Sequence, residues 1–127
     1  MRVYYEDTDS GGVVYYANYL KFLERARTEW LRAAGFTQTG LAARQRVGFV
    51  VRALAIEYLK PCVLDDALQV TVELIKVGAS LMVLVQRVMC EGEVRVSAEV
   101  RLACVDRVAL KPVRIPKAIV TRTGTTS

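Results

Sequence analysis

A single helical pattern, between residues 17 and 34, most restricts what this chain can fold into. Apolar side chains recur there at spacings near 3.6 residues, and Gly35 follows as a stop signal. Most of the remaining chain alternates with the period of strands, over Val3–Glu6 and in four segments after residue 49. One helix of about 27 Å covers a single face of a sheet. The order predicts an α+β fold, with a curved five-stranded antiparallel sheet wrapped around one long helix.

Turn residues separate the four later strands, which we expect over residues 50–58, 68–74, 81–90 and 94–108. Pro61 ends the first, and Gly78-Ala79-Ser80 predicts a hairpin turn before the third. A further short helix is expected over Leu41–Arg46. No repeat or linker divides the chain, so we expect one domain over residues 1–120 and a flexible polar tail over residues 121–127.

Composition excludes several classes of site. The chain has no histidine, which rules out Ser-His-Asp and Cys-His catalysis and the zinc-protease motifs. Cys62, Cys90 and Cys104 are odd in number and widely spaced, which favours reduced, packed thiols over a disulfide framework or a metal site. We expect no metal and no cofactor. No apolar run is long enough to span a membrane and no signal region begins the chain, so the expected location is the cytoplasm.

The charge balance is mildly basic, with 18 Lys and Arg against 13 Asp and Glu and a formal net charge of +5. The basic residues are spread along the chain among acidic ones, and no nucleic-acid-binding motif is present. This pattern favours a small polyanionic ligand over nucleic acid. A hydrophobic content of 53% is more than one small core needs, which indicates contact between subunits of a homo-oligomer.

The segment Tyr4–Tyr19 holds most of the candidate chemistry. Glu6, Asp7 and Asp9 precede the Gly11-Gly12 turn and the start of the helix. A carboxylate at a helix start lies beside unpaired N–H groups and the positive end of the helix dipole, where water can be activated and a carbonyl polarised. An ordinary Asp is ionised at pH 7 whereas a phenol with a pKa of about 10 is not. Asp9 is therefore the preferred base or nucleophile, and the Tyr16 side chain packs or donates a hydrogen bond.

This segment also fits other interpretations. Asp followed by Ser-Gly-Gly is also ordinary turn chemistry. Asp9-Ser10-Gly11 matches the triplet of dimeric aspartic proteases, but a long helix follows too soon for that fold. A calcium loop counted from Asp7 needs Glu at its twelfth position, where Asn18 stands. Asn18 is expected to cap the helix, with the positioning of water as the alternative.

Three segments together resemble a known family. They are Y-E-D-T-D-S-G-G-V-V-Y-Y-A-N-Y with the following L-K-F-L-E-R-A-R-T-E-W-L-R, then F-V-V-R-A-L-A-I-E-Y-L-K-P, then L-D-D. They are similar to hotdog-fold acyl-CoA thioesterases associated with the Tol–Pal system, close to the 4-hydroxybenzoyl-CoA thioesterase group. The resemblance implies a homo-oligomer, dimer or tetramer, that hydrolyses acyl-CoA to free acid and CoA at sites between subunits.

The resemblance also implies residue roles. Asp9 attacks the thioester or deprotonates water, and backbone N–H groups near Tyr16 and Ala17 hold the thioester oxygen. Gly12, Val13, Tyr16 and Asn18 are the implied substrate contacts. Many Tol–Pal-associated members carry histidine at the position of Tyr16. The basic residues that the hydroxybenzoyl group carries around Gly78-Ala79 are absent here. Candidate contacts for the CoA phosphates are Lys60, Lys76, Arg87, Arg101 and Arg114.

Two alternatives stay open on the sequence. One is a non-catalytic module that binds acyl-CoA or an acyl-carrier protein for an envelope complex. The other is a thioesterase specific for aromatic, hydroxybenzoyl-type substrates.

Overall fold

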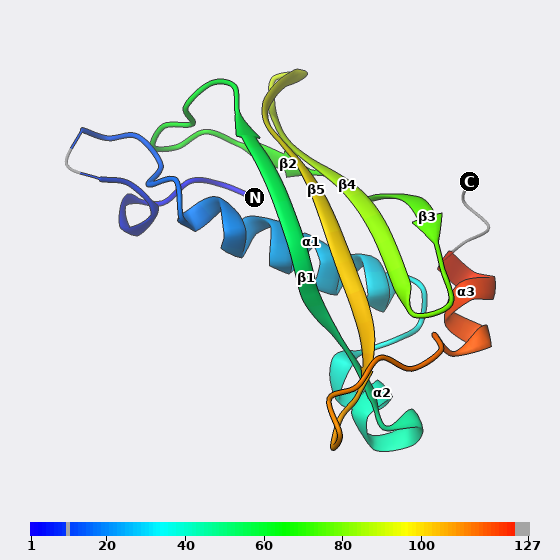
Figure 1. Cartoon of the computed structure of the whole chain (residues 1–127). Helices are drawn as coiled ribbons and strands as arrows, with labels where there is room; N and C mark the ends of the chain where they lie inside the picture. Colours follow the sequence, from blue (N-terminus) through cyan, green and yellow to red (C-terminus); the bar gives the residue numbers. More distant parts are fainter. Residues whose placement is uncertain (10, 124–127) are drawn as a thin grey trace.

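The computed structural model describes residues 1–9 and 11–123 (Figure 1). The long helix α1 (Asn18–Ala33) packs on one face of an antiparallel sheet, as predicted. The strands are β1 (Val47–Tyr58), β2 (Leu68–Val70), β3 (Glu73–Val77), β4 (Leu81–Cys90) and β5 (Glu93–Asp106). Shorter elements are the 3₁₀-helix η1 (Tyr5–Asp7) and the helices α2 (Gln38–Gln45) and α3 (Lys117–Thr123). The expected α+β hotdog architecture is confirmed.

The sheet has β5 and β4 at its centre and β1 at one edge. Its order is β1-β5-β4-β2, and β3 pairs with another part of β4. Alternate residues of β4 and β5 point toward α1 and are buried, among them Leu84, Val88, Val96 and Val100. They meet Phe22 and Leu23 of the helix in one continuous core. The alternation of burial follows the period of two that predicted these strands.

The helix α1 ends where the sequence predicts. Gly35 has φ +95°, the left-handed conformation that glycine tolerates best. Its N–H donates to Arg32 C=O at 2.9 Å, and the N–H of Phe36 donates to Leu31 C=O at 2.9 Å. These two bonds form a Schellman motif, which satisfies carbonyls at the helix end.

Two strand predictions differ from the structure. Val3–Glu6 is not a strand: Arg2 forms an isolated bridge to Ala67, and η1 follows. The reason is local, because the Asp7 carboxylate accepts a hydrogen bond from Tyr4 N–H at 3.0 Å and folds the chain into a turn. The expected strand over residues 68–74 is broken into β2 and β3. At the break, Thr71 Oγ1 accepts from Arg87 N–H at 3.1 Å, so a side chain replaces a backbone partner.

The two shorter helices also shift the expected boundaries. Thr37 Oγ1 accepts from Gly40 N–H at 2.9 Å and caps α2, which therefore begins three residues before the expected start. The expected flexible tail differs as well, since residues 121–123 belong to α3 and Thr123 is buried. Ile119 and Thr123 lie four residues apart on one helix face, and that face is buried. Residues 124–127 of the expected tail lie outside the described residues.

A buried amide joins α1 to the centre of the sheet. Gln86 on β4 is fully buried, and its Nε2 donates to Leu23 C=O at 3.0 Å. Its Oε1 accepts from Arg27 Nη1 at 2.9 Å. Burial lowers the pKa of the Arg27 guanidinium below its ordinary value. The hydrogen bond to Gln86 helps to offset the cost of burying this charge. The helix is thus held in one register against β4.

We predict that Gln86→Ala lowers the free energy of unfolding by about 2–4 kcal/mol, because it creates a cavity and removes both hydrogen bonds. Urea unfolding followed by circular dichroism measures this change. Gln69→Ala on β2 is the matched control, since Gln69 is exposed and the loss there should stay within about 0.5 kcal/mol. Equal losses in the two variants would contradict the role given to Gln86.

Candidate active site

The loop from Tyr4 to Ala17 folds back onto the start of α1. Its closing bonds converge on Asp7, whose backbone carbonyl accepts from Tyr15 N–H at 3.0 Å and from Asn18 Nδ2 at 3.0 Å. Inside the loop, Asp9 N–H donates to Val13 C=O at 2.8 Å, and Gly12 N–H donates to Asp9 C=O at 3.0 Å. Gly12 has φ +82°, so a side chain there would strain the turn.

The connection after β1 anchors this loop. Val14 N–H donates to Cys62 C=O at 2.8 Å, Leu64 N–H donates to Gly12 C=O at 3.3 Å, and Val13 forms a bridge with Val63. Cys62 N–H in turn donates to the hydroxyl of Tyr19 at 3.0 Å. Segments some fifty residues apart in the sequence are therefore joined on the buried side of the loop.

Asp9 lies on the exposed side of the same loop. Its Oδ1 accepts a hydrogen bond from Gly11 N–H at 2.8 Å. Its Oδ2 has no hydrogen-bond partner among the described residues. This oxygen is free to approach a ligand or a water molecule. The structure gives no hydrogen bond between the Asp9 carboxylate and Tyr16 or Ala17, so in the single chain the candidate base and the predicted oxyanion donors belong to one loop without a direct bond.

The start of α1 leaves two amides without acceptors. The N–H groups of Asn18, Tyr19 and Leu20 donate back to the carbonyls of residues 15, 16 and 17, in a 3₁₀-like turn. The preceding N–H groups, those of Tyr16 and Ala17, have no acceptor within the described part of the chain. They lie at the positive end of a sixteen-residue helix, where a negative oxygen is stabilised. These are the two positions at which oxyanion donors were predicted.

Asn18 does not cap the helix, so that prediction is wrong. The N-cap is Ala17, which has no side-chain bond, and Asn18 is the first helical residue. The Asn18 side chain instead donates to the carbonyl of Asp7 and ties the loop that holds Asp9 to the helix. A side chain that is already in the helix faces back toward the loop, which favours this longer-range bond over capping.

Four tyrosine rings surround the helix start. The ring centroids of Tyr15 and Tyr16 are 4.9 Å apart, and the ring of Tyr58, at the end of β1, meets Tyr16 edge-on at 6.1 Å. A hydrogen bond with Tyr16 raises the pKa of the Tyr15 phenol. Tyr19 lies beneath, 5.6 Å from Tyr58, and burial raises its pKa. The Tyr16 ring thus packs against Tyr15 and Tyr58. Tyr58 was not predicted as a member of this group, because the other five tyrosines all fall within the first 19 residues.

The three cysteines are packed thiols. All three are buried and form no disulfide, and desolvation raises the pKa of each thiol. A raised pKa leaves less thiolate at neutral pH, so none is an activated nucleophile. Within residues 1–9 and 11–123, no cluster of three or more His, Cys, Asp or Glu side chains is arranged to hold a metal ion. Over the same residues, no helix is long and apolar enough to cross a membrane.

Several candidate phosphate contacts are occupied by ion pairs. Lys60 pairs with Glu93 at 2.7 Å, Arg87 with Glu73 at 3.5 Å and Arg101 with Glu99 at 3.3 Å. Arg114 forms no ion pair among the described residues. It lines a hollow of about 680 Å³ together with Lys117, Gly78 and Ala79. The turn itself has no cation, but the segment leading into α3 places two beside it.

We predict that Tyr19→Phe lowers the free energy of unfolding by about 1–3 kcal/mol, because it leaves the buried N–H of Cys62 without an acceptor. Tyr58→Phe is the matched control: its hydroxyl donates to Tyr16 C=O at 3.4 Å in an exposed setting, and little change is expected. Urea unfolding of both variants gives the comparison, and faster amide exchange at Cys62 in Tyr19→Phe alone identifies the cause. A larger loss in Tyr58→Phe would show that the anchor lies elsewhere.

Comparison with known proteins identifies the family of the chain. Residues 3–122 match the model of the thioesterase-like superfamily. The chain is 49% identical over 119 residues to the acyl-CoA thioesterase YbgC of Haemophilus influenzae, covering 94% of this chain and 88% of that one. It is 48% identical over 121 residues to the acyl-CoA thioester hydrolase YbgC of Escherichia coli, with coverage of 94% and 90%. The crystal structure of a probable thioesterase from Bartonella henselae superposes with a TM-score of 0.87 at 35% identity, covering 91% and 95%. The chain therefore belongs to the thioesterase-like superfamily, which confirms the family expected from its sequence.

Proposed function

We propose that this chain hydrolyses acyl-CoA thioesters to a free acid and CoA, with Asp9 as base or nucleophile. The observation that carries the proposal is the pair of acceptor-free amides at Tyr16 and Ala17, in the loop that also holds Asp9. Relatives with nearly half of their residues identical are named acyl-CoA thioesterases, which supports the same reaction here.

In the proposed reaction, Asp9 Oδ2 takes a proton from water while the water oxygen attacks the thioester carbon. The carbonyl oxygen becomes an oxyanion that accepts hydrogen bonds from Tyr16 and Ala17 N–H, each such donor being worth about 3–4 kcal/mol. Collapse breaks the carbon–sulfur bond, and the proton held by Asp9 passes to the leaving thiolate. In the nucleophilic variant, Oδ2 itself attacks, CoA leaves, and water hydrolyses the mixed anhydride.

The substrate contacts follow from the same loop. Gly12 and Val13 form the turn beside the carboxylate, Tyr16 offers a ring face, and the Asn18 amide keeps the loop against the helix. For the CoA phosphates, the unpaired Arg114 and the adjacent Lys117 are better candidates than Lys60, Arg87 or Arg101, whose charges are already paired. We further propose that the protein is cytoplasmic and associated with the Tol–Pal system.

We also propose that the active form is a homo-oligomer, dimer or tetramer, paired through β1. This edge strand is twelve residues long, and Val50, Val51 and Leu54 are 47%, 47% and 39% exposed. Long apolar edge strands template pairing with another chain. Because β1 ends at Tyr58, beside the helix start, antiparallel pairing of two copies would bring the beginning of the second β1 near the Asp9 loop and cover it.

A binding module without catalysis is the competing function, with acyl-CoA or an acyl-carrier protein as its ligand. Release of free thiol from a panel of acyl-CoAs, including short aliphatic, long aliphatic and benzoyl esters, separates the two. Stoichiometric binding without thiol release would favour the module. A rate confined to the benzoyl ester would identify an aromatic-specific thioesterase.

We predict that Asp9→Asn lowers kcat for thiol release by at least about a hundredfold while the unfolding midpoint stays unchanged. The amide keeps the hydrogen bond from Gly11 N–H but cannot take a proton. Glu6→Gln is the matched control, an exposed carboxylate of the same loop, and it should retain wild-type turnover. Near-normal hydrolysis by Asp9→Asn would reject the assignment.

We predict that Val51→Lys/Leu54→Lys converts the oligomer to monomers and lowers thiol release at least about tenfold, because charges on β1 oppose edge pairing. Light scattering after size exclusion measures the mass. Ile75→Lys, an exposed position on β3, is the control and should change neither quantity. A double variant that stays oligomeric, or a monomer with full activity, would contradict interface sites.

A further inference from the structure

The most exposed large hydrophobic side chain among the described residues, Val108, lies far from the Asp9 loop. It is 86% exposed, and its near neighbour Leu110 is 69% exposed. Both belong to the turn after β5, between Arg107 and Lys111, at the end of the sheet where α2 and α3 lie (Figure 1). Each of these largely exposed aliphatic side chains is next to a cation in the sequence. Neither packing of the core nor the proposed thioesterase site explains their exposure.

Hydrogen bonds within this turn keep its two apolar side chains exposed. Val108 N–H donates to Asp106 Oδ1 at 3.0 Å, Leu110 N–H donates to Asp106 C=O at 2.8 Å, and Asp106 N–H donates to Lys111 C=O at 2.9 Å. Leu110 has φ +57°, a left-handed conformation that is uncommon for a leucine. The closed turn therefore keeps Val108 and Leu110 exposed instead of letting them fold onto the sheet.

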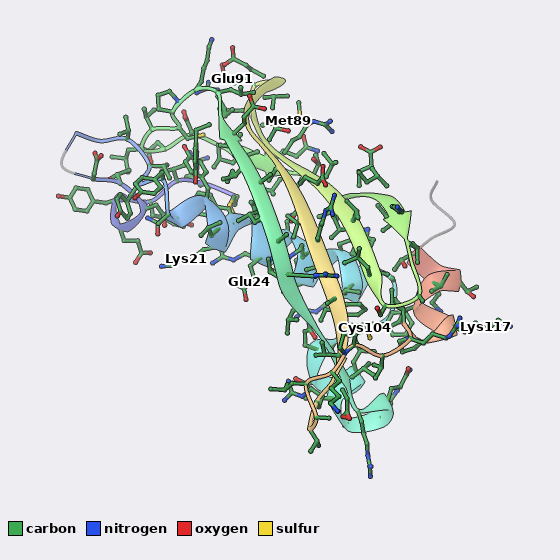
Figure 2. All side chains as sticks on the ribbon, in the orientation of Figure 1. Lys21, Glu24, Met89, Glu91, Cys104 and Lys117 are labelled. Carbon is green, nitrogen blue, oxygen red and sulfur yellow. The ribbon has the colours of Figure 1, made fainter. Side chains whose placement is uncertain are left out.

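The same end of the molecule is rich in cations. Residues 30–56 and 107–123 contain nine of the eighteen Lys and Arg residues and no Asp or Glu. The two stretches meet, since Arg107 N–H donates to Arg46 C=O at 2.9 Å, and Arg44 and Arg122 line one hollow between α2 and α3. Figure 2 shows Lys117 on α3, at the other end of the sheet from Glu91. We call this surface the basic end; apart from the CoA candidates Arg114 and Lys117, its cations are Arg44, Arg46, Arg107, Lys111 and Arg122.

Carboxylates do not neutralise the charges of the basic end. Among the described residues, none of its five cations forms an ion pair with Asp or Glu, and Arg122 donates to the carbonyl of Ala34. The one carboxylate next to the turn, Asp106, is bonded to the backbone of Val108. A surface of this kind attracts a polyanion strongly.

We propose that the basic end docks on a bilayer that contains anionic phospholipids, with Val108 and Leu110 inserted below the headgroups. Juxtaposed cations bind the lipid phosphates, and apolar side chains enter the headgroup–acyl boundary. A nucleic acid or an acidic protein would satisfy the charges but gives no reason for two outward aliphatic side chains flanked by Arg and Lys. The surface is at the opposite end of α1 from the Asp9 loop, so docking leaves that loop accessible.

The test is sedimentation of the whole chain with vesicles of phosphatidylcholine alone or with about one-third phosphatidylglycerol. We expect binding to the anionic vesicles only, weakened by salt. Val108→Ser/Leu110→Ser changes no charge and should weaken binding at least about tenfold, because the inserted apolar area is lost. Unfolding midpoints show that the variants remain folded.

A matched pair of variants isolates the site. Leu110→Ser/Lys111→Gln removes an adjacent apolar and basic residue from the turn, and Ile75→Ser/Lys76→Gln removes the same adjacent types from β3, where Ile75 is 50% exposed. The first should weaken vesicle binding and the second should not. Equal binding to neutral vesicles, no binding to either vesicle, or unchanged binding by Val108→Ser/Leu110→Ser would overturn the proposal. The last result, with competition by a soluble oligonucleotide, would identify a purely electrostatic surface. None of these outcomes depends on thiol release, so the proposal can fail while the thioesterase stands.

Discussion

The fold and the candidate site both depend on how the segment after β1 is joined to the start of α1. Tyr19 belongs to the buried face of the helix, yet its hydroxyl accepts from the N–H of Cys62, and the Cys62 carbonyl accepts from Val14 N–H in the Asp9 loop. Helix, sheet and loop therefore meet at one buried point. Breaking these bonds would bury backbone groups without partners, which costs free energy. The bonds therefore hold the loop in place, with Asp9 on its exposed side.

The two ends of α1 are used differently. At the start, acceptor-free amides and the helix dipole favour a negative ligand, whereas at the end the carbonyls are closed by the Schellman bonds. Arg122 Nη1 donates to Ala34 C=O at 3.3 Å, and its guanidinium lies 5.7 Å from the centre of the Phe36 ring. A cation at the C-terminal end complements the dipole. The helix thus carries the proposed chemistry at one end and supports the basic end at the other.

Periodicity predicted what depends on burial, and missed what depends on single hydrogen bonds. The helix, its stop at Gly35, the hairpin at residues 78–80 and the long central strands follow from apolar spacing and turn residues, and they are confirmed. The failures at Val3–Glu6, at the break near Thr71 and at Asn18 each come from a side chain that bonds a distant or local backbone group. The basic end was also not predicted from the sequence, because the fold brings together cations that are spread along the chain.

Only part of the Asp9 site can be predicted from a single chain. The residue type and its place before a helix start were predictable, because carboxylates and helix amides are a general means to activate water and hold an oxyanion. Its surroundings were not, because the single chain leaves the carboxylate exposed with one bond to Gly11. Preorganised donors act most strongly where water is excluded. Since β1 presents an unpaired apolar edge that runs to Tyr58, pairing of two copies is the arrangement that would both bury this edge and remove water from the Asp9 loop.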